Sequence, residues 1–220
     1  MTMSTQKTIA VVLSGCGVND GSEIHEAVLT LLAIDRQGAR YQCFAPNVAQ
    51  RDVVDHVAGA PVAETRNVLV ESARIARGRI RDLALFDAAR VDAMILPGGF
   101  GAAKNLSSYA VDGAECTVEP GVAKAIRAMR AAGKPIGALC IAPTVVAKVL
   151  GDVTVTIGND PGCAADIVKM GGRHQVRGHG EVAVDTANRI VTTPCYMLDA
   201  SIRQIADGAE NVVKAVLAMA

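Results

Sequence analysis

Cys140 is the residue of this 220-residue sequence whose type and position point most directly to covalent chemistry. It stands in the run GALCIAP (137–143), which is typical of a short strand, one cysteine and the start of a helix. Such a sharp turn projects its central side chain into the open edge of a sheet, and the helix start favours a thiolate. The alternative is a buried structural cysteine, the commoner fate of a free thiol. Because position and turn chemistry agree, we interpret Cys140 as a nucleophile.

A glycine-rich loop, PGGFGAAKN (97–105), follows another predicted strand. Glycines allow positive φ angles and let a ligand approach the backbone. The N–H groups of Gly99 and Ile141 are therefore candidates for an oxyanion hole. The alternative is an ordinary tight turn, and the phosphate-loop pattern G-x-x-x-x-G-K-[ST] is not satisfied.

The run SGCGVNDGSEIHE (14–26) contains two carboxylates at the start of a predicted helix. It does not match a dinucleotide fingerprint, because Asp20 occupies the last glycine position and no acid ends the second strand, so we set NAD aside. Glu23 and Glu26 lie three residues apart on one helix face. Two close carboxylates raise the pKa of one of them. For Glu23, the preference of acids for a helix N-terminus is a sufficient explanation; for Glu26, both interpretations stay open.

Two further cysteines follow predicted strands. Cys16 is the rival nucleophile, although it lacks an immediate helix start. Cys195 is expected to line the pocket without reacting. With Glu23 and Asn105, these two complete the set of residues that we expect at the pocket.

The four histidines are weaker candidates. His25 is expected to point away from the site, because it lies about 100° around the helix from Glu26. His56 and His174 are interpreted as surface residues. His179 would serve an amidase triad with Cys140, but it precedes an edge hairpin and a base must reach its nucleophile.

Composition excludes several classes of function. Lys and Arg together number 22 and Asp and Glu 22, so neither a nucleic-acid surface nor a polybasic membrane surface is expected. No apolar run approaches the roughly 20 residues of a membrane span, and no secretory signal is recognisable. The six cysteines form no C-x-x-C pair and no zinc spacing, which indicates free thiols in a reducing cytoplasm and no metal site.

Strand-like and helix-like segments alternate along the whole chain, and we treat 1–220 as a single domain. This alternation predicts an α/β sandwich with a mostly parallel sheet, whose ligands bind beyond the carboxyl ends of the strands. We leave 47–65 as an irregular excursion, and Ser22 is the expected cap of the first helix. The predicted strands are 7–13, 41–45, 93–96, 135–139, 181–185 and 189–192, and the predicted helices are 22–38, 67–77, 118–132, 143–150 and 198–220.

Five separated motifs resemble the ElbB-type glyoxalases, also called enhancing-lycopene-biosynthesis or isoprenoid-biosynthesis proteins. This family belongs to the PfpI-like branch of the class I glutamine amidotransferase-like superfamily. The resemblance runs from about residue 7 to the C-terminus. Its motifs are SGCGVNDGSEIHE (14–26), ETRN (64–67), PGGFGAAKNLS (97–107), CIAP (140–143) and TTPCYML (192–198).

The resemblance implies a flavodoxin-like three-layer α/β/α sandwich that forms a homodimer and needs no cofactor. By motif, Cys140 takes the place of the reactive cysteine, Glu26 that of the acid, and Gly99 and Ile141 those of the oxyanion hole. Ile141 stands where the hydrolases of the superfamily have histidine, which argues against protease or amidase activity. The implied activity converts a small aldehyde, glyoxal or methylglyoxal, to its hydroxy acid without glutathione. A redox-sensing thiol protein remains the non-enzymatic alternative.

Overall fold

The computed structural model describes residues 6–220. The helices are α1 (Ile24–Arg36), α2 (Val68–Ile75), α3 (Phe100–Lys104), α4 (Tyr109–Asp112), α5 (Pro120–Ala131), α6 (Pro143–Leu150), α7 (Pro161–Lys169) and α8 (Ile202–Met219). The strands are β1 (Thr8–Val12), β2 (Arg40–Ala45), β3 (Val53–Asp55), β4 (Ala60–Val62), β5 (Ile80–Asp82), β6 (Ala93–Leu96), β7 (Ile136–Leu139), β8 (Thr154–Val155), β9 (Arg173–His174), β10 (Ala183–Asp185) and β11 (Ile190–Thr193).

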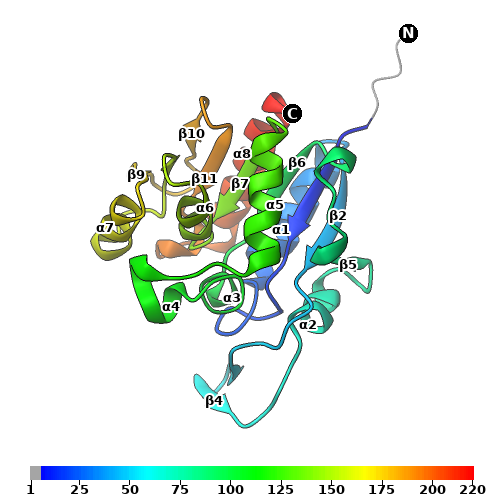
Figure 1. Cartoon of the computed structure of the whole chain (residues 1–220), viewed down its shortest axis with the longest axis vertical. Coiled ribbons are helices and arrows are strands. Elements are labelled where there is room, and N and C mark those ends of the chain that lie inside the picture. Colours follow the sequence, from blue (N-terminus) through cyan, green and yellow to red (C-terminus); the bar gives the residue numbers. More distant parts are fainter. Residues whose placement is uncertain (1–5) are drawn as a thin grey trace.

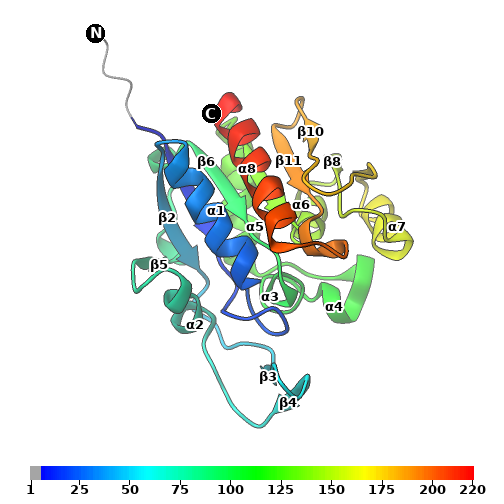
Figure 2. The same ribbon diagram turned by 180° about the vertical axis from the view of Figure 1, so that it is seen from behind.

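The described residues form a seven-stranded sheet in the order β10-β11-β7-β6-β1-β2-β5. Every pair in it is parallel except the β10–β11 hairpin. Helices α1 and α8 lie side by side on one face, and α5 and α6 cover the other (Figures 1 and 2). The central strands are buried on both faces, because successive residues such as Val11 and Val12 pack into different apolar clusters on opposite sides of the sheet. The predicted flavodoxin-like α/β sandwich with a mostly parallel sheet is confirmed.

Strand register brings three loops to one edge of the sheet. Val11 pairs with Ile95, and Ile95 pairs with Gly137, so β1, β6 and β7 end at nearly the same height. A parallel sheet presents the carboxyl ends of its strands on one side, where the loops after them meet. The loops after these strands therefore converge at the edge that the sequence predicts to hold the site.

Two local predictions are wrong. Ser22 does not cap α1; Glu23 does, because its carboxylate accepts the N–H of Glu26 at 2.7 Å, while the Ser22 hydroxyl is buried against Ser14. The segment 47–65 is not wholly irregular, since β3 and β4 pair as an antiparallel ribbon within it. This ribbon extends away from the sheet (Figures 1 and 2).

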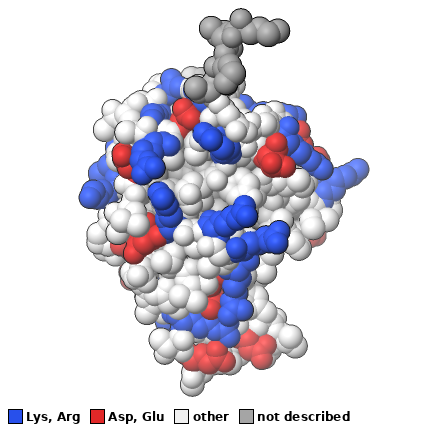
Figure 3. All heavy atoms as spheres, turned by 90° about the vertical axis from the view of Figure 1, so that its right-hand side faces the viewer, with Lys and Arg blue, Asp and Glu red and all other residues white. Residues whose placement is uncertain are grey.

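Acidic and basic side chains are interspersed on the face shown in Figure 3. Among residues 6–220, no helix is long and apolar enough to cross a bilayer.

Candidate active site

Cys140 occupies a strained strand-to-helix turn. Its φ is +59°, in the left-handed region that non-glycine residues rarely adopt, and its N–H bonds to the carbonyl of Thr193 at 3.0 Å. The residue follows β7 directly, and α6 begins at Pro143. Its side chain is buried at the end of the sheet. The backbone geometry is that of a nucleophile elbow, as the sequence predicts.

Glu26 lies in the first turn of α1 and is fully buried. One carboxylate oxygen accepts the N–H of Gly98 at 2.9 Å, and the other accepts that of Tyr196 at 3.3 Å. The carboxyl group lies beside the Cys140 side chain, because a Cβ added on Gly98 would overlap both groups. Burial, reinforced by the neighbouring Glu23, raises the pKa of Glu26 to about 8. The acid that the motif assigns to the cysteine is thus its direct neighbour, and it holds a proton at neutral pH.

The Cys140 thiol is subject to opposing influences. Burial and the Glu26 carboxylate raise its pKa well above the ordinary range, while the N–H groups of Gly99 and Ile141 lower it. The helix start therefore acts in the predicted direction but is outweighed in the free protein. The thiol and the carboxyl group form one coupled pair that does not carry two negative charges near neutral pH.

The N–H groups of Gly99 and Ile141 are close enough to the Cys140 sulfur to lower the pKa of the thiol. Gly99 has φ +95°, and a Cβ there would overlap the backbone of 21–23, so only glycine fits this position. Two backbone donors beside a buried thiol are an arrangement that an oxyanion hole would use.

A cavity of about 370 Å³ opens over Cys140. Glu23 and Tyr196 contribute polar groups to its lining. The Tyr196 hydroxyl shares a 2.8 Å hydrogen bond with Nδ1 of His25, so His25 reaches the rim of the site through this tyrosine. The prediction that His25 lies off the site is therefore only partly right. Apolar residues from several segments form much of the wall: Val18, Phe100, Ala103, Ala110, Ile141 and Met197.

Of the four further residues predicted at the pocket, Glu23 lines the cavity, while Cys16, Asn105 and Cys195 do not. Cys16 is half-buried, and the charged groups that act on its thiol include Glu71 and Arg74 of α2. Cys195 is buried with its sulfur toward α8, 3.5 Å from where a Cβ on Gly208 would lie.

Asn105 holds loops together instead of facing a ligand. Its amide nitrogen donates to the carbonyls of Ser14 and Asp20, both at 2.8 Å, and its oxygen accepts the N–H of Arg51 at 3.0 Å. The side chain is buried. It fixes the loop after β1 against α3, the helix that Gly99 precedes.

We expect Asn105→Ala to lower the free energy of unfolding by about 2–4 kcal/mol, because three backbone groups lose their partner in a buried place. Asn67→Ala is the control; it removes the half-buried cap of α2 and should lower the free energy of unfolding by about 1 kcal/mol. Urea unfolding of both variants measures the difference. Equal losses would contradict the role assigned to Asn105.

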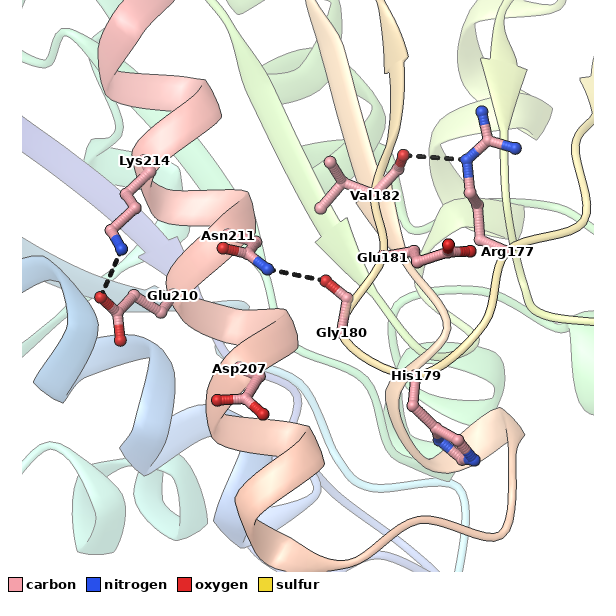
Figure 4. Close-up of a pocket in the computed structure, with 9 residues that line it drawn as sticks. All are labelled: Arg177, His179, Gly180, Glu181, Val182, Asp207, Glu210, Asn211 and Lys214. Atoms are coloured by element: carbon pink, nitrogen blue, oxygen red, sulfur yellow. Dashed lines mark hydrogen bonds and ion pairs between the residues drawn. The ribbon is translucent and has the colours of Figure 1, made fainter.

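His179 does not share a cavity with Cys140. It lines a separate polar groove between α8 and the segment that precedes β10, together with Arg177, Asp207 and Asn211 (Figure 4). An amidase triad of Cys140 and His179 is therefore not assembled. The surface interpretation of His56 and His174 is incomplete, since their rings accept the N–H groups of Asn19 and Ile157.

Among the lining residues that are not named as candidates from the sequence, three carry a hydroxyl or thiol group: Tyr109, Cys163 and Tyr196. Tyr196 lies in TTPCYML, so its motif was noted but its N–H contact with Glu26 was not predictable. Tyr109 and Cys163 come from α4 and α7, two helices that the sequence pattern did not predict.

The chain is similar to curated proteins over almost its whole length, although no protein-family model matches it. It is 50% identical to the human protein called glutamine amidotransferase-like class 1 domain-containing protein 3, mitochondrial, with 95% of this chain and 82% of the relative covered. It is 38% identical to the ES1 protein, mitochondrial, of Danio rerio, with 96% and 85% covered. Both names place those relatives in mitochondria.

Solved structures similar to this chain lead to the same family. The isoprenoid biosynthesis protein with amidotransferase-like domain from Ehrlichia chaffeensis superposes with a TM-score of 0.91 at 41% identity, covering 97% of this chain and 99% of that one. A DJ-1 superfamily protein from Salmonella typhimurium has a TM-score of 0.61 at 21% identity, covering 97% and 91%, and shares the fold. The chain therefore belongs to the family of the ES1 proteins and the ElbB-type isoprenoid biosynthesis proteins with an amidotransferase-like domain, and it has the fold of the DJ-1 superfamily.

Proposed function

We propose that this protein is a cofactor- and glutathione-independent glyoxalase that converts glyoxal, and methylglyoxal, to the hydroxy acid. One observation carries the proposal: a protonatable carboxyl group, Glu26, lies beside the Cys140 side chain below a cavity. Burial raises the pKa of Glu26 to about 8, close to the operating pH of a general acid or base. Strongly shifted groups that share a cleft are typical of active sites.

In the proposed reaction, the Cys140 sulfur adds to one aldehyde carbon and gives a hemithioacetal. The N–H groups of Gly99 and Ile141 stabilise the oxyanion that forms. The protonated Glu26 gives its proton to this oxyanion, and the resulting carboxylate then takes the proton from the carbon that bears sulfur, so that an enediolate results. A proton returned to the neighbouring carbon yields a thioester, which water cleaves to glycolate and the free thiol. Glyoxal and one water thus become glycolic acid, with no external oxidant or reductant.

Two alternatives are supported less well. A glutaminase needs a base beside the cysteine and a cation for the substrate's α-carboxylate; His179 is in another groove, and no Lys or Arg is among the described residues that line the cavity. A peroxide sensor needs a low thiol pKa, whereas burial and Glu26 raise that of Cys140.

One panel of assays on the purified wild-type protein tests the proposal. We expect glycolate from glyoxal without glutathione or added metal, no ammonia from glutamine, and little sulfenic acid at modest peroxide. Ammonia release, or rapid oxidation without aldehyde turnover, would overturn the glyoxalase assignment in favour of the corresponding alternative.

The rate of glyoxal conversion should rise with pH. Below a pH of about 8 the Cys140–Glu26 pair holds both protons, and loss of the first gives the singly charged form that can attack an aldehyde. We expect kcat/KM to increase by nearly tenfold per pH unit up to about pH 8 and to level above it. Initial rates at constant ionic strength between about pH 6 and pH 9 measure this, and a flat profile would contradict the assignment.

The cytoplasmic location and the homodimer stay predictions. Cell fractionation and sedimentation of the purified protein test them.

A further inference from the structure

The cavity over Cys140 is larger than glyoxal requires. Its volume of about 370 Å³ lies within the roughly 300–1,000 Å³ typical of pockets for drug-sized ligands. It has room for about a dozen waters, each with a share of about 30 Å³. A molecule of two linked aldehyde groups leaves most of this space unfilled.

The space beyond the thiol is apolar. Phe100 and Ala103 come from α3, Val18 from the loop after β1, and Met197 from the turn after β11. Phe100 is 51% exposed and Val18 38%, so apolar side chains also form part of the molecular surface at the cavity. Such walls offer few hydrogen bonds to hydrated glyoxal, but they gain free energy by covering a hydrophobic group.

The charges at the cavity also restrict which molecules can occupy it. The ionisable groups at the cavity include the carboxyl group of Glu23 and, behind the thiol, that of Glu26. No Lys or Arg is among its described lining residues. An anionic substrate would lose its hydration there without gaining a cation, so the cavity selects neutral molecules.

We propose that the preferred substrates are neutral 2-oxoaldehydes that carry an aromatic or branched aliphatic substituent. This inference rests on the proposed glyoxalase function and specifies its substrate class. The aldehyde carbon lies at the Cys140 sulfur, and the substituent lies against Phe100 and Met197.

The reaction follows the same steps as the one proposed for glyoxal, in which one carbon of the substrate is oxidised and its neighbour is reduced. Sulfur adds to the aldehyde carbon, Glu26 moves the proton from that carbon to the ketone carbon, and water cleaves the thioester. The aldehyde carbon is oxidised to the carboxylic acid, and the ketone carbon is reduced to the alcohol. Phenylglyoxal and one water give mandelic acid, so no other reactant is needed.

Product formation from a substrate series provides the first test. We expect kcat/KM for mandelate formation from phenylglyoxal to exceed that for lactate formation from methylglyoxal by roughly ten- to a hundredfold, the gain for burying a phenyl-sized group. Detecting the hydroxy acid separates turnover from modification of arginines by the reagent.

A pair of variants assigns the gain to the apolar wall. Phe100→Ser should lower the ratio of the two kcat/KM values about tenfold, because the substituent loses its largest apolar contact. Leu85→Ser is the matched control, since Leu85 is 68% exposed and outside the lining; it should leave the ratio unchanged.

Alkylation of Cys140 by iodoacetamide gives a readout without turnover. Acetophenone, an unreactive ketone of the proposed shape, should protect the thiol, whereas acetone at equal concentration should not. Turnover of methylglyoxal with no preference for phenylglyoxal and no protection would overturn this inference and leave the glyoxalase proposal intact. Protection without any turnover would overturn the glyoxalase proposal while supporting the apolar selectivity, and neither effect would overturn both.

Discussion

Glu26→Gln will lower kcat for glyoxal at least about a hundredfold, because the variant cannot move the proton between the two substrate carbons. It will also change how stability depends on pH. Burial raises the pKa of Glu26 from 4.5 to about 8 in the folded protein. Between these values the unfolded chain releases a proton that the folded chain keeps, so wild-type stability falls as pH rises.

The size and the sign of this change in stability both follow from the pH range between the two pKa values of Glu26. The full shift corresponds to about 5 kcal/mol, lost by the wild type between about pH 4.5 and pH 8. Glutamine removes this loss but has one oxygen for two backbone donors, Gly98 and Tyr196, which costs about 1 kcal/mol at every pH. The variant should therefore be less stable than the wild type near pH 4.5 and more stable near pH 8.5.

Urea unfolding at several pH values measures the pH at which the wild type and Glu26→Gln are equally stable. Glu115→Gln, at an exposed position, is the control and should follow the wild type. Parallel stability curves for the wild type and Glu26→Gln would show that the carboxyl group is not held protonated by its surroundings.

Gly98→Ala will reduce turnover at least about a hundredfold, since displacements of about 1 Å can have that effect. A Cβ on Gly98 would overlap the Cys140 side chain and lie 2.7 Å from the Glu26 carboxylate and 2.9 Å from the Leu139 carbonyl. The side chains of Cys140 and Glu26 must move apart to make room for this Cβ. Overpacking of this kind also lowers the free energy of unfolding by about 1–3 kcal/mol.

The matched control for Gly98→Ala is Gly178→Ala. An added Cβ there would lie 3.5 Å from Glu181, an ordinary van der Waals contact, and neither glycine has a positive φ. The control should retain activity and stability. Glyoxal turnover and thermal unfolding of both variants test this, and full activity of Gly98→Ala would mean that the thiol and the carboxyl group need not be adjacent.

Strong local signals made the central fold predictable. The buried strands 93–96 and 135–139 are continuous apolar runs ended by glycine or by the elbow, and both appear within one residue of their predicted bounds. The ribbon of β3 and β4 was missed because each strand has three residues, and β4 is exposed and contains Pro61. Strand β5 was missed for a similar reason, since this edge strand is short and not fully buried.

The candidate site was predictable only in part. Cys140 and Gly99 are marked by turn chemistry, and the family resemblance supplied the pairing of Cys140 with Glu26. Asn105 was misassigned because a buried asparagine that joins three loops has the same local sequence context as one that faces a ligand. The cavity wall combines segments that are distant in the sequence, so its apolar character follows from the tertiary fold alone.

The most direct measurement is glycolate formation from glyoxal, without glutathione, by the wild type and by Cys140→Ala and Cys16→Ala. Our account predicts turnover by the wild type, at least about a thousandfold loss in Cys140→Ala, and unchanged turnover in Cys16→Ala. Turnover that survives in Cys140→Ala and disappears in Cys16→Ala would contradict it, because the nucleophile would then be the other cysteine that follows a strand.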